Sequence, residues 1–295
     1  MRSYNEKLYK TQLEELSWEW AERFVPKVDV NDILMNQKGN VNSANYKKYG
    51  YNVNFWYPKE GINALPQAFF KNINKRKVYL NKEVKRISLS QKTIELSDGT
   101  VKKWDLLISS IPLPNLLSLI VDVPIPLKKL SKKLRWVSIY NLNIGTSGNP
   151  PSDAHWIYFP DKQYSFYRIG FPSSLSPYMS PEGAYSLSVE ASFLPRFVPN
   201  FERWKSKIIK NLLRIKFLPS LRDICIAKEL IIPFAYVIPD SNYKNSREIV
   251  LSFLSKHAIL NIGRYGLWEY SSIQDAILEG EIAAKSVHEI TMKTK

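Results

Sequence analysis

Two short apolar segments, far apart in the chain, constrain the fold more than any other feature. Residues 105–111 (DLLISSI) are apolar on both faces, and two prolines follow them directly. A strand of this kind is covered on each side, as strands of parallel sheets are. Residues 258–263 (AILNIG) resemble a second strand, and a helix is expected over 273–288. We expect the two strands to share one sheet, with that helix covering it.

The helix expected over 273–288 has small and apolar residues at spacings of three and four, which places them on one face. The stripe comprises Ile273, Ala276, Ile277, Gly280, Ala283, Ala284, Val287 and Ile290. Ser271 or Ser272 can cap the helix, with Gln274 or Asp275 three residues later. Free amides at its start offer partial positive charge to a ligand oxygen. A packed helix without any ligand is the alternative.

The other segments predict an α+β fold in two lobes. Residues 77–112 alternate apolar and polar side chains, and Asp98-Gly99 supplies a hairpin turn. Aromatic-rich segments between 134 and 194 predict a mostly antiparallel sheet, and 201–217 predicts an amphipathic helix. A helix is also expected from Thr11, with Glu14 at capping-box spacing. Residues 36–54 are polar and rich in turn formers, which predicts an exposed loop.

Composition narrows the function classes. The formal net charge of +15 favours anionic partners, but the lysines are scattered, so we expect a solvated basic surface and no nucleic-acid partner. Cys225 is the single cysteine and there are three histidines, so neither a disulfide framework nor a metal site is expected. Four prolines interrupt the most apolar tract, 106–127, so no transmembrane segment is expected. The N-terminus has no secretory signal pattern, which predicts a cytoplasmic protein.

Several segments together resemble a known superfamily. Residues 263–284 (GRYGLWEYSSIQDAILEGEIAA) resemble the C-terminal flavin-binding signature of the FAD-dependent amine oxidase, protoporphyrinogen oxidase and UDP-galactopyranose mutase superfamily. SYNEKLYKTQLEEL resembles the mutase-type YxEKxW helix start, with Tyr9 in place of the usual Trp. FWYPKEGINALPQAF resembles a glycine-rich segment of the superfamily, with Glu60 replacing its first glycine. VYLNKEVKRI and DLLISSIPLPNLL resemble the return of the chain into the FAD domain.

The resemblance implies the C-terminal part of a Rossmann-like flavoprotein, with a substrate domain of antiparallel sheet and helices. No G-x-G-x-x-G pattern occurs in the sequence, although that pattern cradles the FAD pyrophosphate in complete members. We therefore expect a truncated chain or one half of a split flavoprotein. The expected division is a helical segment of the substrate lobe at 1–65, strands returning to the FAD domain at 66–115, the substrate domain at 116–235 and the C-terminal FAD-domain strand and helix at 236–295.

The resemblance also implies the binding residues, whereas the flavin itself carries the chemistry and no protein nucleophile is expected. The FAD contacts implied are Val84 through its backbone, Gly263, Arg264, Tyr270, Ser272 and Ile273. The implied substrate contacts are Tyr9, Arg23, Lys27, Arg168, Tyr236 and Trp268. Other interpretations stay open: a cross-strand charge for Arg168, a solvated face for Arg23 and Lys27, and a core position for Tyr236.

The implied function is that of a FAD-dependent oxidoreductase acting on a small molecule by hydride transfer. The alternative is a mutase-type isomerisation of a sugar nucleotide, which the basic charge favours. Against it, Ser272 stands where mutases carry an acidic residue, and no second diphosphate arginine lies near Val137. A third interpretation is a non-catalytic fragment or assembly partner, which would need a separate G-x-G-x-x-G polypeptide to bind FAD.

Overall fold

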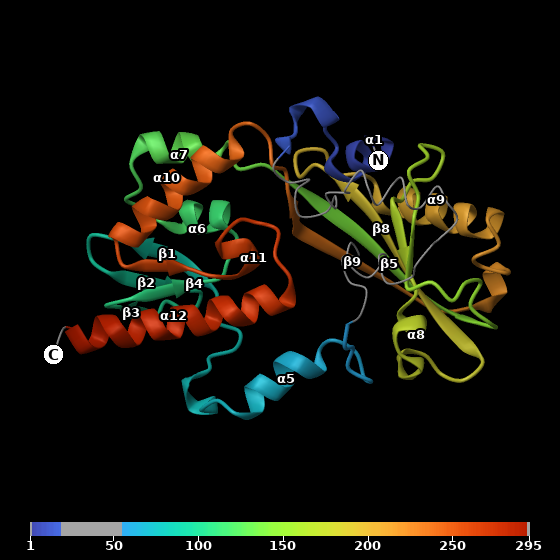
Figure 1. Ribbon diagram of the computed structural model, residues 1–295, viewed down its shortest axis with the longest axis horizontal. Helices are drawn as coiled ribbons and strands as arrows, with labels where there is room; N and C mark the ends of the chain where they lie inside the picture. Colours follow the sequence, from blue (N-terminus) through green and yellow to red (C-terminus); the bar gives the residue numbers. More distant parts are fainter. Residues whose placement is uncertain (1, 19–54, 294–295) are drawn as a thin grey trace, which may run out of the picture.

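The computed structural model describes residues 2–18 and 55–293, which form two lobes side by side (Figure 1). The loop expected over 36–54, together with Arg23 and Lys27, lies outside the described residues. Each lobe has its own buried apolar core, one built mainly from 84–134 and 250–268 and the other from strands and helices between 136 and 238. The chain crosses between the lobes near Arg135, later than the border expected at 116, because 113–131 packs in the first core.

The first lobe combines two small sheets with helices. A three-stranded antiparallel sheet has the order β1-β2-β3, and β4 pairs with β10 in a separate parallel pair. The elements are β1 (Val84–Ser88), β2 (Thr93–Leu96), β3 (Val101–Lys103), β4 (Leu107–Ser109), α6 (Leu113–Leu119), α7 (Ile125–Ser131), α10 (Tyr243–Lys256), β10 (Ile259–Asn261), α11 (Gly263–Gly266) and α12 (Ile273–Lys293).

The parallel pairing of β4 with β10 confirms the expectation that these two apolar segments share a sheet. Ile259 lies opposite Leu107, and Asn261 lies opposite Ser109. Helix α10 packs against β10, and its Val250 and Leu254 are fully buried in the core that contains Ile259. Because the two strands are parallel, their carboxyl ends lie at the same edge of the pair, where α11 and α12 follow.

The second lobe is a five-stranded antiparallel sheet with the order β6-β7-β8-β5-β9. Helix α9 covers one face with Ile208 and Leu212, and α1 covers the other with Leu8 and Tyr9. The elements are α1 (Arg2–Tyr9), β5 (Trp136–Ser147), β6 (Trp156–Tyr158), β7 (Arg168–Gly170), α8 (Pro172–Leu175), β8 (Ala184–Phe193), α9 (Phe201–Arg214) and β9 (Ile224–Val237).

Short helices connect these elements. They are the 3-10 turns η1 (Leu13–Glu15), η3 (Lys75–Lys77), η4 (Pro177–Met179) and η5 (Leu221–Asp223), and helix α5 (Ala64–Lys71). The prediction of a helix that starts at Thr11 is wrong for the described residues, where only the 3-10 turn η1 forms. The Thr11 hydroxyl lies 3.1 Å from Glu15 and 3.0 Å from Arg135, so its polar group is used in tertiary contacts rather than in a cap.

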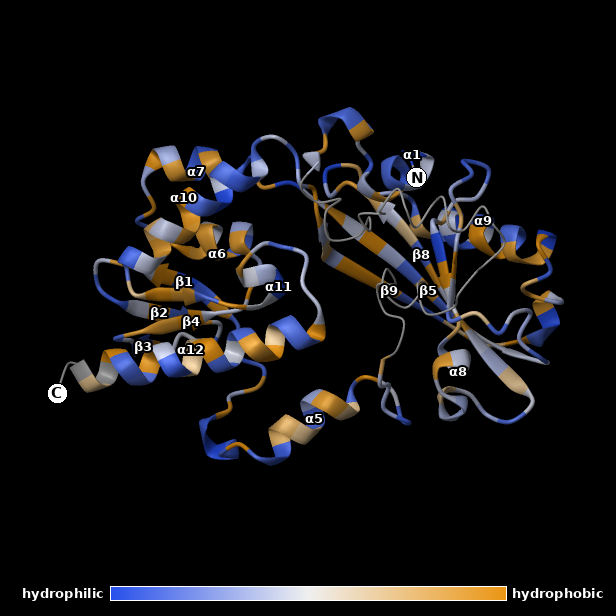
Figure 2. Ribbon diagram, viewed as in Figure 1, coloured by the Kyte–Doolittle hydropathy of each residue, from blue (hydrophilic) through white to orange (hydrophobic). Residues whose placement is uncertain are grey.

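Helix α12 forms where it was expected, and Figure 2 shows apolar residues along it. Its apolar stripe is nevertheless largely exposed. Ala283 is the one stripe residue that is buried, while Ile273 is 50% and Ile277 41% exposed. A β-carbon added at Gly280 would meet no atom within 4 Å, so the small residues do not bring this helix against a sheet. Within the described residues, no helix is long and apolar enough to span a membrane.

Candidate functional site

Arg264 joins the two lobes at their junction. The residue belongs to α11, yet its Nη2 donates to the Ala235 carbonyl of β9 at 3.1 Å and its Nη1 to the Ser271 carbonyl at 3.5 Å. The guanidinium also faces two aromatic rings, at 4.9 Å from the centre of Tyr236 and 4.5 Å from that of Tyr270. These rings are nearly parallel, with 12° between their planes. Cation–π contact therefore fixes a positive charge beside two tyrosines.

Arg168 forms a second cationic centre on the same lobe as Tyr236. Its Nη2 lies 2.6 Å from Glu190 Oε1, directly across from β7 to β8, as the cross-strand interpretation expects. Burial disfavours its charge, but Glu190 and Tyr236 outweigh burial and hold the pKa of Arg168 above its usual value. The Tyr167 hydroxyl donates to the same carboxylate. Arg168 is therefore held in place as a cation.

Tyrosines link the two cationic centres. Burial raises the pKa of Tyr236, while the charges of Arg168 and Arg264 both oppose that rise, so the ring lies within electrostatic reach of both arginines. Burial likewise raises the pKa of Tyr9, with Tyr236, Tyr270 and Arg264 as the neighbours that act on it. The structure thus brings together five of the predicted site residues: Tyr9, Arg168, Tyr236, Arg264 and Tyr270.

A row of unpaired polar atoms lies at the ends of the parallel strands. Ser109 lies at the end of β4, Asn261 at the end of β10 and Ser271 before α12. The Ser109 Oγ, Asn261 Nδ2 and Ser271 Oγ atoms are buried, and none has a hydrogen-bond partner among residues 2–18 and 55–293. Buried polar groups without partners are costly and rare, so each calls for an explanation. Ligands of open α/β sheets bind outside the carboxyl ends of the strands, which is where Ser109 and Asn261 lie. The arrangement fits a polar cofactor arm.

The backbone around α11 approaches the end of β4 closely. A β-carbon at Gly266 would lie 2.6 Å from the Ser109 carbonyl oxygen, so this position requires glycine. Gly263 has φ +74°, which other residues rarely adopt, and a β-carbon there would meet open space. Its amide donates to Glu279 Oε2 at 2.5 Å, so the turn already holds one carboxylate oxygen.

Ser272 begins α12 as the sequence predicts. Its Oγ accepts from the Asp275 amide at 3.2 Å, and its own amide donates to Asp275 Oδ2 at 2.7 Å. This reciprocal pair is the expected capping box and confirms one of the alternatives that the sequence leaves open. Ile273 follows it and is half exposed, so the first turn of α12 is accessible to a ligand.

Trp268 and Val84 lie in other surroundings. Trp268 is 1% exposed and packs edge-on against Trp136 and Phe234 in the core, so its prediction as a substrate contact is not supported. Its side chain belongs to the same apolar core as Val250 and Leu254 of α10, and Tyr243 donates to the Trp268 carbonyl at 2.7 Å. Val84 starts β1 and is partly buried at the same core.

Sequence reasoning missed several members of the site. Tyr4 stacks edge-on against Tyr158 and Tyr167, at 4.9 and 6.0 Å between ring centres, and completes the aromatic wall beside Arg168. The spacing of Tyr4 and Tyr9 within the helix-forming start of the chain was the available signal. Ser109 and Asn261 carried a signal too, since both end the apolar strands that define the parallel pair.

Comparison with known proteins assigns the family. The sequence model described as flavin containing amine oxidoreductase matches residues 38–209, and the chain belongs to this family. A crystal structure of reduced UDP-galactopyranose mutase superposes with a TM-score of 0.82 at 29% identity, covering 92% of this chain and 60% of that one. The chain thus spans well under two thirds of the length of that protein.

Two more distant structures share the fold alone. One is a protein from Exiguobacterium sp. 255-15 assigned as a protoporphyrinogen oxidase, with a TM-score of 0.65 at 12% identity, covering 82% of this chain and 54% of that one. The other is the CLA-producing fatty acid isomerase from P. acnes, with a TM-score of 0.55 at 10% identity, covering 76% and 52%. The recurrence of the fold among such different proteins means that the site, rather than the fold, must indicate the function.

Proposed function

We propose that this chain forms one side of the FAD site, and most of the substrate site, of an amine oxidase-like FAD-dependent oxidoreductase. The observation that carries the proposal is the row of unpaired polar atoms on Ser109, Asn261 and Ser271, directly beside the Arg264 turn. FAD, when bound, would accept a hydride from the substrate. The chain's own residues would hold it through these polar groups and through the open backbone at Gly263, with Val84, Tyr270, Ser272 and Ile273 as further contacts.

The substrate side of the proposal is the Tyr9, Arg168, Tyr236 and Arg264 cluster. Arg264 favours a small anionic molecule, because its guanidinium contacts two tyrosine rings and two backbone carbonyls, and a guanidinium fork matches carboxylate and phosphate oxygens. Arg168, which is paired with Glu190, would lie beside that molecule as a second fixed charge. The tyrosines would orient the substrate and exclude water from it. Arg23 and Lys27 remain proposed substrate contacts on the basis of the resemblance.

The proposal includes a separate polypeptide that carries G-x-G-x-x-G. This sequence lacks that pattern, and the apolar residues of α12 are exposed beside the parallel pair. Such a unit would cover these residues and supply the pyrophosphate cradle. A cytoplasmic location belongs to the same proposal, since the lone Cys225 provides no disulfide framework.

A second candidate function is mutase-type isomerisation of a sugar nucleotide. The 29% identity with UDP-galactopyranose mutase over 92% of this chain favours it, and so do the two arginines facing Tyr236. Under this function Arg168 and Arg264 would bind a diphosphate instead of a carboxylate.

Reconstitution tests both candidates. The chain would be co-purified with the glycine-rich N-terminal segment of a related flavoprotein, and bound FAD measured by its visible absorbance. Gly263→Val should abolish FAD binding, while the control Gly99→Val, at a positive-φ glycine (φ +80°) on the distant β2–β3 hairpin, should leave it intact. Equal FAD content in the two variants would contradict the proposed site.

The loaded protein would then be given amines and UDP-galactopyranose in separate assays. Reduction of the flavin by an amine would support the oxidoreductase, and interconversion of the sugar nucleotide would support the isomerase. Arg168→Met should lower either activity at least tenfold, because the site would lose one fixed cation. Full FAD content without either activity would favour the non-catalytic interpretation.

A further inference from the structure

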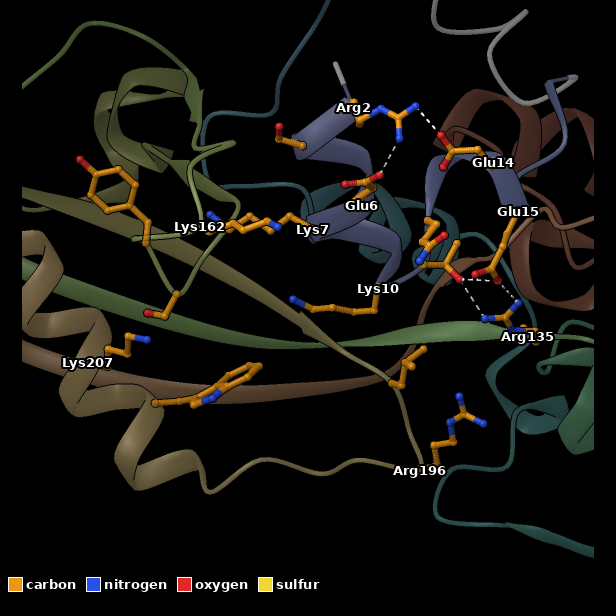
Figure 3. Close-up of a pocket in the computed structure, with 17 residues that line it drawn as sticks. Arg2, Glu6, Lys7, Lys10, Glu14, Glu15, Arg135, Lys162, Arg196 and Lys207 are labelled. Atoms are coloured by element: carbon orange, nitrogen blue, oxygen red, sulfur yellow. Dashed lines mark hydrogen bonds and ion pairs between the residues drawn. The ribbon is translucent and has the colours of Figure 1, made fainter.

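A broad groove opens at one end of the five-stranded sheet, between α1 and α9. It has a volume of about 1040 Å³ and is bordered by η1, by the loop before β7 and by the segment after β8. Figure 3 shows the charged side chains of these elements converging on it. The groove lies on the face of α1 that carries Lys7 and Lys10, whereas Tyr4 and Tyr9 of the proposed substrate cluster lie against the sheet.

The cations on one side of the groove already have acidic partners. Arg2 pairs with Glu14 and, at 3.4 Å, with Glu6. Arg135 pairs with Asp240 at 3.1 Å and with Glu15 at 3.5 Å. The charges of Arg2 and Arg135 are neutralised within the protein, so this side of the groove does not require a bound anion.

The cations on the other side have no acidic partner among the described residues. They come from four separate parts of the chain: Lys10 after α1, Lys162 before β7, Arg196 after β8 and Lys207 on α9. The Arg196 guanidinium lies over the Phe197 ring, at 4.9 Å from its centre. Lys7 adds a fifth charge, and its Nζ donates to the carbonyls of Phe159 and Asp161 at 2.6 and 2.8 Å instead of to a carboxylate.

The surroundings of Lys7 and Lys10 disfavour the charged form of their ammonium groups. Burial, and then the charge of Lys10, lowers the pKa of Lys7 to about 8. Desolvation by the groove walls also lowers the pKa of Lys10, although part of its side chain is exposed. An anion between these groups would remove the repulsion and replace the lost hydration.

We propose that this groove binds a condensed phosphate, meaning a run of linked phosphate groups, separately from the proposed flavin and substrate site. Four unpaired cations from four parts of the chain require a ligand with several charges spread along its length, which a single carboxylate lacks. Lysine binds phosphate as a point charge, and arginine adds a planar fork. The same chemistry is present in an inorganic polyphosphate and in a nucleoside triphosphate.

Titration calorimetry of the full chain with tripolyphosphate at low salt tests the proposal. Lys10→Gln/Lys207→Gln should weaken binding at least tenfold. The matched control is Lys128→Gln/Lys129→Gln on α7, which removes the same two charges from the same total of +15 and should change affinity less than twofold. All four lysines are exposed, and equal thermal midpoints of the two variants would exclude unfolding as the cause.

Equal losses in both variants would overturn the proposal, because they would show attraction by net charge alone. It would also be overturned by absence of saturable binding in the parent chain, or by sulfate binding as tightly as tripolyphosphate. ATP and tripolyphosphate of similar affinity would support an inorganic ligand, and tighter ATP binding would support a nucleotide. Arg168→Met should leave this affinity unchanged, which separates the groove from the site of the proposed function.

Discussion

Gly266 and Gly280 are both helical glycines in opposite surroundings. At Gly266 an added β-carbon would lie 2.6 Å from the Ser109 carbonyl oxygen and 3.2 Å from Ser110 Cα, both backbone atoms. Gly266→Ala should therefore destabilise the chain by about 2 kcal/mol, since backbone must shift to admit the methyl group. Gly280→Ala meets open space and should stabilise it by up to about 1 kcal/mol. Denaturant unfolding measures both values, and equal effects would contradict this account.

Asp122 holds the turn after β1. Burial opposes its ionisation, but the amides of Leu89 and Ser90, at 3.0 and 2.9 Å, and the Ser90 hydroxyl together lower the pKa of Asp122 to about 2. A carboxyl with a depressed folded-state pKa stabilises the protein above its unfolded pKa, here near 3.8, and this contribution is lost as pH falls through 2.

Asp122→Asn should accordingly destabilise the chain by about 1 kcal/mol at neutral pH, a value reduced from that of a buried charged hydrogen bond because the carboxylate is exposed. The difference between parent and variant should shrink as pH falls below about 4. Urea unfolding at a series of pH values measures it. If the difference in unfolding free energy stayed constant down to about pH 2.5, close to the folded-state pKa, the charge of Asp122 would not be its cause.

At the scale of elements, the sequence was informative where local chemistry decides the structure. The two-sided apolar segments became the parallel pair, and Ser272 with Asp275 became the cap of α12. It misled where tertiary contacts compete with local ones. Thr11 has a capping-box neighbour, yet its hydroxyl accepts a hydrogen bond from Arg135, which directly precedes β5 of the large sheet, and only a 3-10 turn forms. No local pattern reports such a distant partner.

The cap of α12 gives a prediction at this scale. Ser272→Ala removes the oxygen that accepts from the Asp275 amide and should cost about 1 kcal/mol. Ser286→Ala is the matched control in the same helix, because Ser286 bonds back to the Ile282 carbonyl at 3.0 Å, an interaction that supports helix structure little. The control should be neutral or slightly stabilising. Helicity by circular dichroism during urea unfolding distinguishes them, and equal losses would argue against a capping role.

At the scale of the whole molecule, sequence patterns predicted which elements form but not what covers them. The stripe on α12 predicts a buried helix, and the helix forms with Ile273, Ile277 and Ile290 exposed. Likewise, Trp268 lies in a flavin-signature segment but is buried by α10. The four unpaired cations of the groove come from distant segments, so no sequence window shows them together. Which face of a helix is buried, and which distant side chains meet in a groove, depend on tertiary neighbours. The periodicity of the sequence does not encode these neighbours.

The exposed stripe leads to the last prediction. Ile277 and Ile290 of the stripe are 41% and 46% exposed, so Ile277→Gln/Ile290→Gln removes apolar surface at little cost to the folded chain. Alone, this variant should bind less of a hydrophobic dye and aggregate less than the parent. With the glycine-rich segment supplied, it should retain less FAD, because the proposed partner would meet polar side chains instead of the stripe.

The matched control is Val198→Gln/Leu221→Gln, which removes two exposed apolar residues, at 65% and 61%, from the other lobe. It should reduce dye binding to a similar extent but leave FAD retention at the parental level. Co-purification followed by flavin absorbance and a dye titration reads out both effects on the same samples. If the α12 variant retained as much FAD as this control, the stripe would not be the surface that the glycine-rich partner covers, and an edge of the β4–β10 pair would be the next surface to test.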